Sequence, residues 1–499
     1  MPALIDRWFH PRAALFAGLA FIAGSCPSNN QAAETPPARP NIVWIFVDDM
    51  SANFSCYGEK TIQTPNVDRM AAEGTRFSRA YITCPVCSPC RSALITGMFQ
   101  TTIGAHNHRS GRGTEKILLP TGVVPVPVLF QKAGYYTCIG GPPGKRGLGK
   151  TDYNFEWDAS MYDGADWSGR KDGQPFFMQV QLPGGKHRGG KAWPATVRRE
   201  LGSVTRPEDV VLPPYYPRDS VLLQDWAEYL DACRYTDKLV GDVLKRLTDE
   251  GILDQTYVFF MTDHGISHAR GKQFLYDEGI HVPLVIRGPK IEKGIVRDDF
   301  AQQIDLAATS LALAGIEIPA TMQGKDILAK DYKPRNEVFS ARDRCDETVE
   351  HIRSVRTNDF KYIRNYYPNR PHLQPNRYKD QKAIVRRLRE LHAAGELNEL
   401  QEKLLFSPKR APEELYDLKA DPHELRNLAG DPKFAKKLAE LRSRLTRWEE
   451  ETGDRGRTPE PVAMYDSDMA QYIGSKGGPQ VDVLKKNIAL MKQWAQEGK

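Results

Sequence analysis

A run of seven mostly apolar residues, 41–47, ends in two consecutive aspartates, Asp48 and Asp49. Its length and its β-branched residues favour a strand that is buried on both faces, as strands in parallel sheets are. Similar runs occupy residues 135–140, 175–182, 256–262 and 282–287, and helical patterns at 223–247 and 304–314 separate several of them. The sequence therefore predicts an α/β domain with a large, mostly parallel sheet between helices.

The pattern changes after about residue 340. Residues 352–364 predict two short strands around an Asn-Asp turn, and the highly charged segment 378–410 is expected to be helical. A further helix is predicted over 432–451, with Leu438, Leu441, Leu445 and Trp448 at helical spacing and assigned to the core. We expect a catalytic domain at 40–340 and a smaller C-terminal α+β subdomain at 341–499, with a small antiparallel sheet and helices.

Residues 1–25 have the composition of an export signal. Arg7 and Arg12 precede an apolar run at 13–23 that is too short to span a membrane stably. The four residues that end in Cys26 resemble a weak bacterial lipobox, so cleavage alone and lipid attachment at Cys26 both remain open. Residues 26–39 predict a flexible leader. The expected location is exported, either periplasmic or lipid-anchored and extracellular.

The charge balance limits the choice of partners. The chain has 69 Lys and Arg against 63 Asp and Glu, a net charge of +6, without a concentrated basic block. Nucleic-acid binding is therefore not expected. Export would permit disulfides among the eight cysteines, although the spacing does not give their pairing.

Acidic residues follow two of the predicted strands. Asp48 and Asp49 follow the first, and Asp263-His264-Gly265 follows the strand predicted at 256–262. In parallel sheets, ligands bind beyond the carboxyl ends of strands. Adjacent carboxylates repel one another unless a positive charge lies between them, and a hard divalent cation with oxygen ligands would supply that charge. Helix capping by one aspartate and solvation of the other is the alternative.

Cys87-Ser88-Pro89-Cys90-Arg91 is the most specific motif in the chain. An iron–sulfur reading of Cys84, Cys87 and Cys90 would need a fourth cysteine where Leu94 stands, and a zinc site would need a second ligand pair. A simple buried thiol remains open from the residues alone. The motif resembles the Cys-x-Pro-x-Arg signature of the type I sulfatases, which have an alkaline-phosphatase-like fold.

That resemblance spans roughly residues 40–450 and implies a set of roles. A maturation enzyme would oxidise Cys87 to formylglycine, whose hydrated form attacks sulfur with one hydroxyl and expels sulfate with the other. Arg91, Lys150 and Lys272 would neutralise the sulfuryl oxygens. Calcium, or else magnesium, would be held by Asp48, Asp49, residue 87, Asp263 and His264, although His264 replaces the commoner Asn.

Two positions depart from the family pattern. Asp152 stands where the family has a His two residues after Lys150, and Lys145 is an alternative to Lys150. The histidine that usually follows the strand predicted at 175–182 is replaced by Lys186-His187, and either residue could protonate the leaving group. His106 and His108 are expected to line the substrate pocket or to lie on a surface loop.

The resemblance implies a sulfuric ester hydrolase that removes sulfate from esters or sulfamates, on sulfated carbohydrates or other small sulfated substrates. Residues 104–109, 212–217 and 263–276 resemble the heparan N-sulfatase-like subset, which implies N-sulfated glucosamine at a chain end as one possible substrate. A phosphonate or phosphodiester hydrolase of the same superfamily is the alternative enzyme. A non-catalytic glycan-binding protein is the alternative of a different class. The oligomeric state is left open.

Overall fold

The computed structural model describes residues 39–499, and these form one compact unit, Arg39–Lys499. The predicted export signal, Cys26 and the leader up to residue 38 lie outside the described residues. Within residues 39–499, the structure contains no helix with the length and apolar character needed to cross a membrane.

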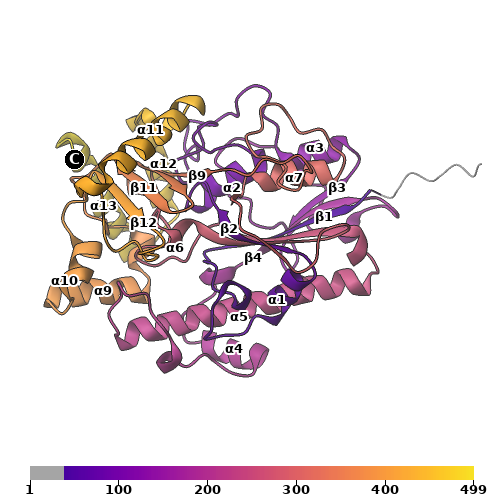
Figure 1. Cartoon of the computed structure of the whole chain (residues 1–499), viewed down its shortest axis with the longest axis horizontal. Coiled ribbons are helices and arrows are strands. Elements are labelled where there is room, and N and C mark those ends of the chain that lie inside the picture. Colours follow the sequence, from indigo (N-terminus) through magenta and orange to yellow (C-terminus); the bar gives the residue numbers. More distant parts are fainter. Residues whose placement is uncertain (1–38) are drawn as a thin grey trace, which may run out of the picture. The chain divides into compact units, whose positions relative to one another are not determined.

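An eight-stranded sheet forms the centre of this unit (Figure 1). Its strands are β1 (Asn41–Val47), β2 (Thr75–Tyr81), β3 (Tyr136–Gly140), β4 (Phe176–Leu182), β5 (Thr256–Thr262), β6 (His281–Arg287), β7 (Ile295–Arg297) and β8 (Ala301–Gln302). The order is β3-β4-β1-β5-β6-β2-β7, with β8 beside β2. β1 runs parallel to both β4 and β5 and all of its residues are buried, which confirms the predicted buried parallel strand.

One strand of the mostly parallel sheet runs antiparallel to its neighbours. β6 pairs antiparallel with β5 and with β2. A parallel neighbour needs a crossover connection, commonly a long helix, whereas only the four-residue helix α6 (Asp277–Ile280) lies between β5 and β6. The chain therefore turns back beside β5, and the sheet as a whole stays mostly parallel.

Helices cover both faces of this sheet (Figure 1). One layer contains α1 (Pro65–Ala72), α4 (Trp193–Leu201) and α5 (Ser220–Asp249), and the other contains α2 (Cys87–Thr96), α3 (Val126–Lys132) and α7 (Asp305–Leu313). α5 begins where the Asp219 side chain accepts a hydrogen bond from the Val221 amide, a typical N-cap. The structure confirms the helices predicted at 223–247 and 304–314.

The C-terminal part contains a four-stranded antiparallel sheet in the order β12-β11-β10-β9. Its strands are β9 (Glu337–Arg342), β10 (Ile352–Thr357), β11 (Phe360–Asn365) and β12 (Glu413–Asp417), and its helices are α8 (Arg377–Asp380), α9 (Ala383–Ala394), α10 (Glu399–Gln401), α11 (Ala435–Glu451), α12 (Val462–Gly474) and α13 (Pro479–Gln496). The predicted hairpin and the buried face of α11 are confirmed. β9 begins before residue 341, so this sheet crosses the expected boundary.

Candidate active site

The acidic residues meet at the carboxyl edge of the large sheet because β1, β4 and β5 are in register. Val47, the last residue of β1, pairs with Leu182 of β4 and with Thr262 of β5. The residues that follow these strands therefore emerge side by side. The Asp49 amide donates a 2.9 Å hydrogen bond to Asp263 Oδ1, and Asp49 itself has a left-handed backbone with φ of 51°.

Cys87 is the first residue of α2 and projects into this acidic edge. Its Sγ lies 3.2 Å from His264 Nε2, 3.0 Å from Lys272 Nζ and 3.6 Å from Lys186 Nζ. Burial alone would raise the pKa of the Cys87 thiol, but the nearby lysines, among them Lys150, outweigh burial and lower this pKa well below its ordinary value. The site therefore stabilises negative charge at residue 87, and the N-terminus of α2 acts in the same direction.

The other two cysteines of the motif have structural surroundings. Cys84 packs with Val86 and Cys345, and the Cys90 thiol donates a hydrogen bond to the carbonyl of Asp263. All seven cysteines within the described residues are unpaired. Because the three thiols do not converge on one point, the geometry gives no support to the iron–sulfur alternative.

Cations surround the carboxylates of the cluster. Asp48 contacts Arg91, Lys150 at 3.2 Å and Lys186 at 2.8 Å. Burial would raise the pKa of Asp48, but these three cations hold it well below the usual range. The Lys272 ammonium lies 3.0 Å from Asp49 Oδ1. Burial would likewise raise the pKa of Asp49, but the nearby cations hold this pKa well below the usual range.

Four side chains could hold a metal ion. The ligand atoms of Asp49, Cys87, Asp263 and His264 all lie within 4.8 Å of one another, and all four residues are buried. Burial, with the negative charge of Asp48, raises the pKa of Asp263 to about 7 although His264 opposes this shift. A cation among these carboxylates would relieve that repulsion, so the donor set fits a divalent ion. Asp48, predicted as a fifth ligand, is the sequence neighbour of Asp49 and contacts Arg91, Lys150 and Lys186 in this structure.

The structure separates the two candidates for the leaving-group acid. Lys186 points at Cys87 and Asp48. His187, although next in sequence, is exposed and its ring lies against Trp193 and Tyr235, 5.3 and 5.8 Å away between ring centroids. The predicted catalytic position of His187 is therefore not reproduced, because neighbouring residues of the short 3-10 turn Gly184–Lys186 and its cap point in different directions.

The two predicted pocket histidines also differ. His108 lies with Cys87 and Asp152 in a group whose ligand atoms are within 4.8 Å, and its Nδ1 is 3.1 Å from Asp346. Its buried Nε2 has no partner among the described residues. His106 is buried beside Arg353 and Asp454, and it does not line the cavity of about 520 Å³ next to His108.

Sequence reasoning missed two residues that the C-terminal part supplies. The Tyr378 hydroxyl donates a 2.8 Å hydrogen bond to Asp49 Oδ2, and Asp346 orients His108. Tyr378 lies in a segment whose only sequence signal was charge and helix propensity. Nothing near Asp346 in the sequence marks it as part of the site, since its partner His108 is more than 200 residues away.

Two family descriptions match the chain. "Sulfatase" matches residues 40–316, and "N-sulphoglucosamine sulphohydrolase, C-terminal" matches residues 267–407. An ulvan-active sulfatase of Formosa agariphila is 33% identical, over 91% of this chain and 82% of the relative. The human N-sulphoglucosamine sulphohydrolase is 28% identical, over 84% of this chain and 91% of the relative.

The fold comparison agrees with these sequence matches. A solved structure of a protein in complex with its substrate, D-glucosamine-2-N,6-O-disulfate, has a TM-score of 0.59 at 21% identity and covers 83% of this chain and 98% of the other. At this identity the likeness establishes the fold alone. It confirms the predicted architecture of a mostly parallel sheet between helices with a smaller antiparallel sheet.

Proposed function

The chain belongs to the sulfatase family, and on that premise we propose that it removes sulfate from sulfated carbohydrates with a formylglycine made from Cys87 and a bound calcium ion. Sulfuric ester hydrolysis itself follows from family membership. One observation supports the site assignment: Cys87 lies where three carboxylates and four cations meet at the carboxyl edge of the sheet.

The charge of this cluster suits a sulfate group. The positive side chains are Arg91, Lys150, Lys186 and Lys272, and the carboxylates are Asp48, Asp49 and Asp263. A divalent cation would add two further positive charges, so an anionic substrate would be needed to balance the site. Preorganised cations of this kind stabilise charge on a transferring group because they need little rearrangement during the reaction.

The proposed metal ligands are Asp48, Asp49, Asp263 and His264, together with residue 87. Carboxylate oxygens favour calcium or magnesium, and calcium tolerates the irregular geometry of such a set better than magnesium does. The ion would supply positive charge that favours an ionised nucleophile. The hydrated aldehyde of formylglycine would supply that nucleophile at position 87.

The surrounding residues then have separate tasks. Lys272 and Lys186, each within 3.6 Å of Cys87 Sγ, would hold sulfuryl oxygens, and Arg91 would orient residue 87 from the next turn of α2. The proton for the leaving group would come from Lys186 or from His108, whose Nε2 has no partner among the described residues. The cavity of about 520 Å³ beside His108 would accept the sugar.

Two adjacent substitutions test this arrangement. With 4-nitrocatechol sulfate and a panel of sulfated oligosaccharides from ulvan and heparin, Lys186→Ala should lower kcat/KM by about 100-fold or more, as loss of one charge-stabilising donor does. His187→Ala, the matched control, should stay within about twofold, because surface substitutions change little. Equal losses of kcat/KM in both variants would contradict the assignment of Lys186 to the site.

The same panel decides between bond types and between enzyme classes. Loss of N-sulfate from glucosamine would support a sulfamidase, whereas loss of O-sulfate alone would support an esterase. Faster cleavage of aryl phosphonates or phosphodiesters than of aryl sulfates would overturn the sulfatase proposal. No turnover on any member of the panel by protein that carries the aldehyde would favour the glycan-binding alternative.

We also propose that the protein is exported. The proposal rests on Arg7, Arg12 and the apolar run at 13–23. Fractionation of cells that express the full chain should place the protein outside the cytoplasm. Deletion of residues 1–25 should keep the protein in the cytoplasm. A Cys26→Ala variant distinguishes lipid attachment, which it would abolish, from cleavage alone, which it would permit.

A further inference from the structure

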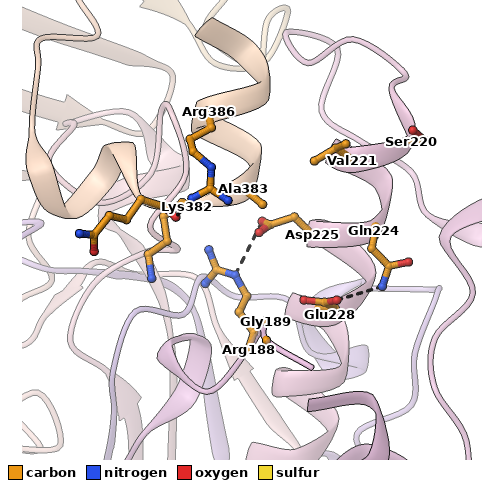
Figure 2. A pocket seen from close by; sticks show the side chains of 12 residues that line it. Arg188, Gly189, Ser220, Val221, Gln224, Asp225, Glu228, Lys382, Ala383 and Arg386 are labelled. Atoms are coloured by element: carbon orange, nitrogen blue, oxygen red, sulfur yellow. Dashed lines mark hydrogen bonds and ion pairs between the residues drawn. The ribbon is translucent and has the colours of Figure 1, made fainter. Parts of the chain in front are cut away.

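A second cavity, of about 500 Å³, opens between the first turns of α5 and α9 (Figure 2). The chain continues from the 3-10 turn that carries Lys186 to Arg188, which lines this cavity. The residues that line it are Arg188, Gly189, Gly190, Ser220, Val221, Gln224, Asp225, Glu228, Gln381, Lys382, Ala383 and Arg386. None of these has a role in the chemistry proposed above.

Arg188 is the most unusual of these residues. Its side chain is only 3% exposed, and its Nη1 donates a hydrogen bond to the carbonyl of Gly185. Its Nε lies 3.7 Å from Asp225, too far for a hydrogen bond, and both Nε and Nη2 lack a partner among the described residues. Buried donors are nearly always paired, so these two nitrogens indicate an acceptor that comes from outside the chain.

A second cation faces the same space. Figure 2 shows the Lys382 side chain beside the guanidinium of Arg188, and a dashed line joins Arg188 to Asp225 on α5. Burial, together with the charge of Arg188, lowers the pKa of Lys382 to about 8. Asp225 pairs with Arg188 at 3.7 Å and also accepts a 2.7 Å contact from His268 Nε2. The lining as a whole has three cations, Arg188, Lys382 and Arg386, against two carboxylates, Asp225 and Glu228, so positive charge is in excess by one.

The start of α9 adds to this field. Lys382 is the N-cap of this twelve-residue helix, and its side chain makes no capping hydrogen bond. The first backbone N–H groups of a helix have no partner inside the helix, and the helix dipole favours an anion there. The helix start and the buried guanidinium thus point to the same chemistry.

The cavity adjoins the sulfate site through one aromatic ring. Tyr378 donates its hydroxyl to Asp49, and its ring centroid lies 4.7 Å from Lys272 Nζ and 4.8 Å from Lys382 Nζ. Lys186 and Arg188 are separated by one residue, so the same turn serves both sites. A group bound at Arg188 could therefore belong to the molecule whose sulfate lies at Cys87.

We propose that Arg188, Lys382 and the N-terminus of α9 bind an oxyanion, a sulfate or a carboxylate, on a sugar unit that neighbours the one losing its sulfate. The proposal rests on the function proposed above and narrows the substrate to glycans with a second anionic group. Asp225 and Glu228 on the wall of the cavity would accept hydrogen bonds from sugar hydroxyls.

The test compares three classes of substrate in wild-type enzyme and variants. These are 4-nitrocatechol sulfate, monosulfated sugars without a second anion, and ulvan- or heparin-derived oligosaccharides with either a second sulfate or a carboxylate. Lys382→Gln and Arg188→Gln should each raise KM for the doubly anionic substrates about tenfold or more, as loss of a charged hydrogen bond does. Activity on 4-nitrocatechol sulfate should change less than about twofold in both variants, as for other substitutions outside the reacting groups.

The controls keep the result interpretable. Arg387→Gln removes a neighbouring α9 cation that pairs with Asp219 outside the cavity, and it should leave all three substrate classes unchanged. Melting temperatures identify any variant that fails to fold. If Arg188→Gln fails to fold, the KM values of Lys382→Gln, at a partly exposed position, decide whether the cavity binds the second anion. The increase in KM is measured separately for the sulfate-bearing and the carboxylate-bearing oligosaccharides. The larger increase shows which oxyanion the site prefers.

Three outcomes would overturn the inference. They are unchanged KM for doubly anionic substrates in both variants, equal losses on every class, and wild-type activity confined to substrates without a second anion. A wild-type enzyme that hydrolyses none of the sulfates would instead refute the proposed function.

Discussion

The two sheets of this protein contribute to the site in different ways. The eight-stranded sheet carries Asp48, Asp49 and Asp263 directly after its strands, in positions fixed by the register of β1 with β5. The four-stranded antiparallel sheet carries no residue of the cluster on its strands. Its region instead supplies Asp346 and Tyr378, from the segments that follow β9 and β11.

This difference predicts a graded response to substitution. Residues at the carboxyl edge of the large sheet lie next to Cys87 and are the proposed metal ligands and sulfate-binding residues. Residues from the C-terminal part act on the site through one hydrogen bond each. Substitutions in the hydrophobic core of the C-terminal part, where α11 packs on the small sheet, should affect stability alone. The four predictions below run from the largest expected effect on turnover to the smallest.

Replacement of the proposed nucleophile should have the largest effect. Cys87→Ala should lower kcat by about 10⁴-fold or more, as removal of a covalent nucleophile does in other hydrolases. The fold should survive because only one small side chain is lost. Mass spectrometry of the tryptic peptide 80–91 from active wild-type protein should show the aldehyde. A free thiol in fully active enzyme would contradict the formylglycine mechanism.

Loss of a proposed metal ligand should come next. Asp263→Asn removes a charge from the carboxylate group and should reduce both bound metal and turnover, the latter about 100-fold or more. Metal content by elemental analysis is the direct measure. Asp237→Asn is the matched control, since this buried acid accepts hydrogen bonds from the start of α1 and should affect stability alone. Full activity after exhaustive chelation would contradict the metal assignment.

The hydrogen bond from the C-terminal part should matter less. Tyr378→Phe removes the donor to Asp49, and a net contribution of about 0.5–1.5 kcal/mol corresponds to a loss of about two- to tenfold in kcat. Tyr362→Phe is the control, because its hydroxyl bonds Glu413 within the small sheet. If Tyr378→Phe were as damaging as Asp263→Asn, the distinction between the two regions would fail.

The core of the C-terminal part should not affect turnover at all. Leu441 is fully buried, in a cluster that also contains Trp448 and Tyr362. Leu441→Ala should destabilise the protein by about 2–5 kcal/mol, as large-to-small core substitutions do. Denaturant unfolding measures this loss, and kcat per folded molecule at low temperature should be unchanged. A selective fall in kcat without loss of stability would show that α11 participates in catalysis.

The sequence by itself determined the strands of the large sheet and the acidic residues that follow two of these strands. The buried run at 41–47 predicts a parallel strand because both faces are apolar, and acids directly after such a strand must lie at its carboxyl edge. The strand pattern alone therefore brings Asp48, Asp49 and Asp263 to one edge of the sheet. The motif at Cys87 carried enough specificity to predict the family, and the helix of 432–451 followed from its apolar spacing.

Only the tertiary structure decided the rest. The direction of β6 depends on how the chain returns after β5, and no local pattern encodes that path. Lys186 and His187 are adjacent and equally polar, so sequence could not tell which side chain points at Cys87 and which packs on Trp193. Asp346 and Tyr378 contact His108 and Asp49, which are more than 200 residues away in the chain, because folding brings the loops of the second sheet against the edge of the first. Local patterns report burial and propensity, whereas contacts across such sequence distances are set by the packing of the whole unit.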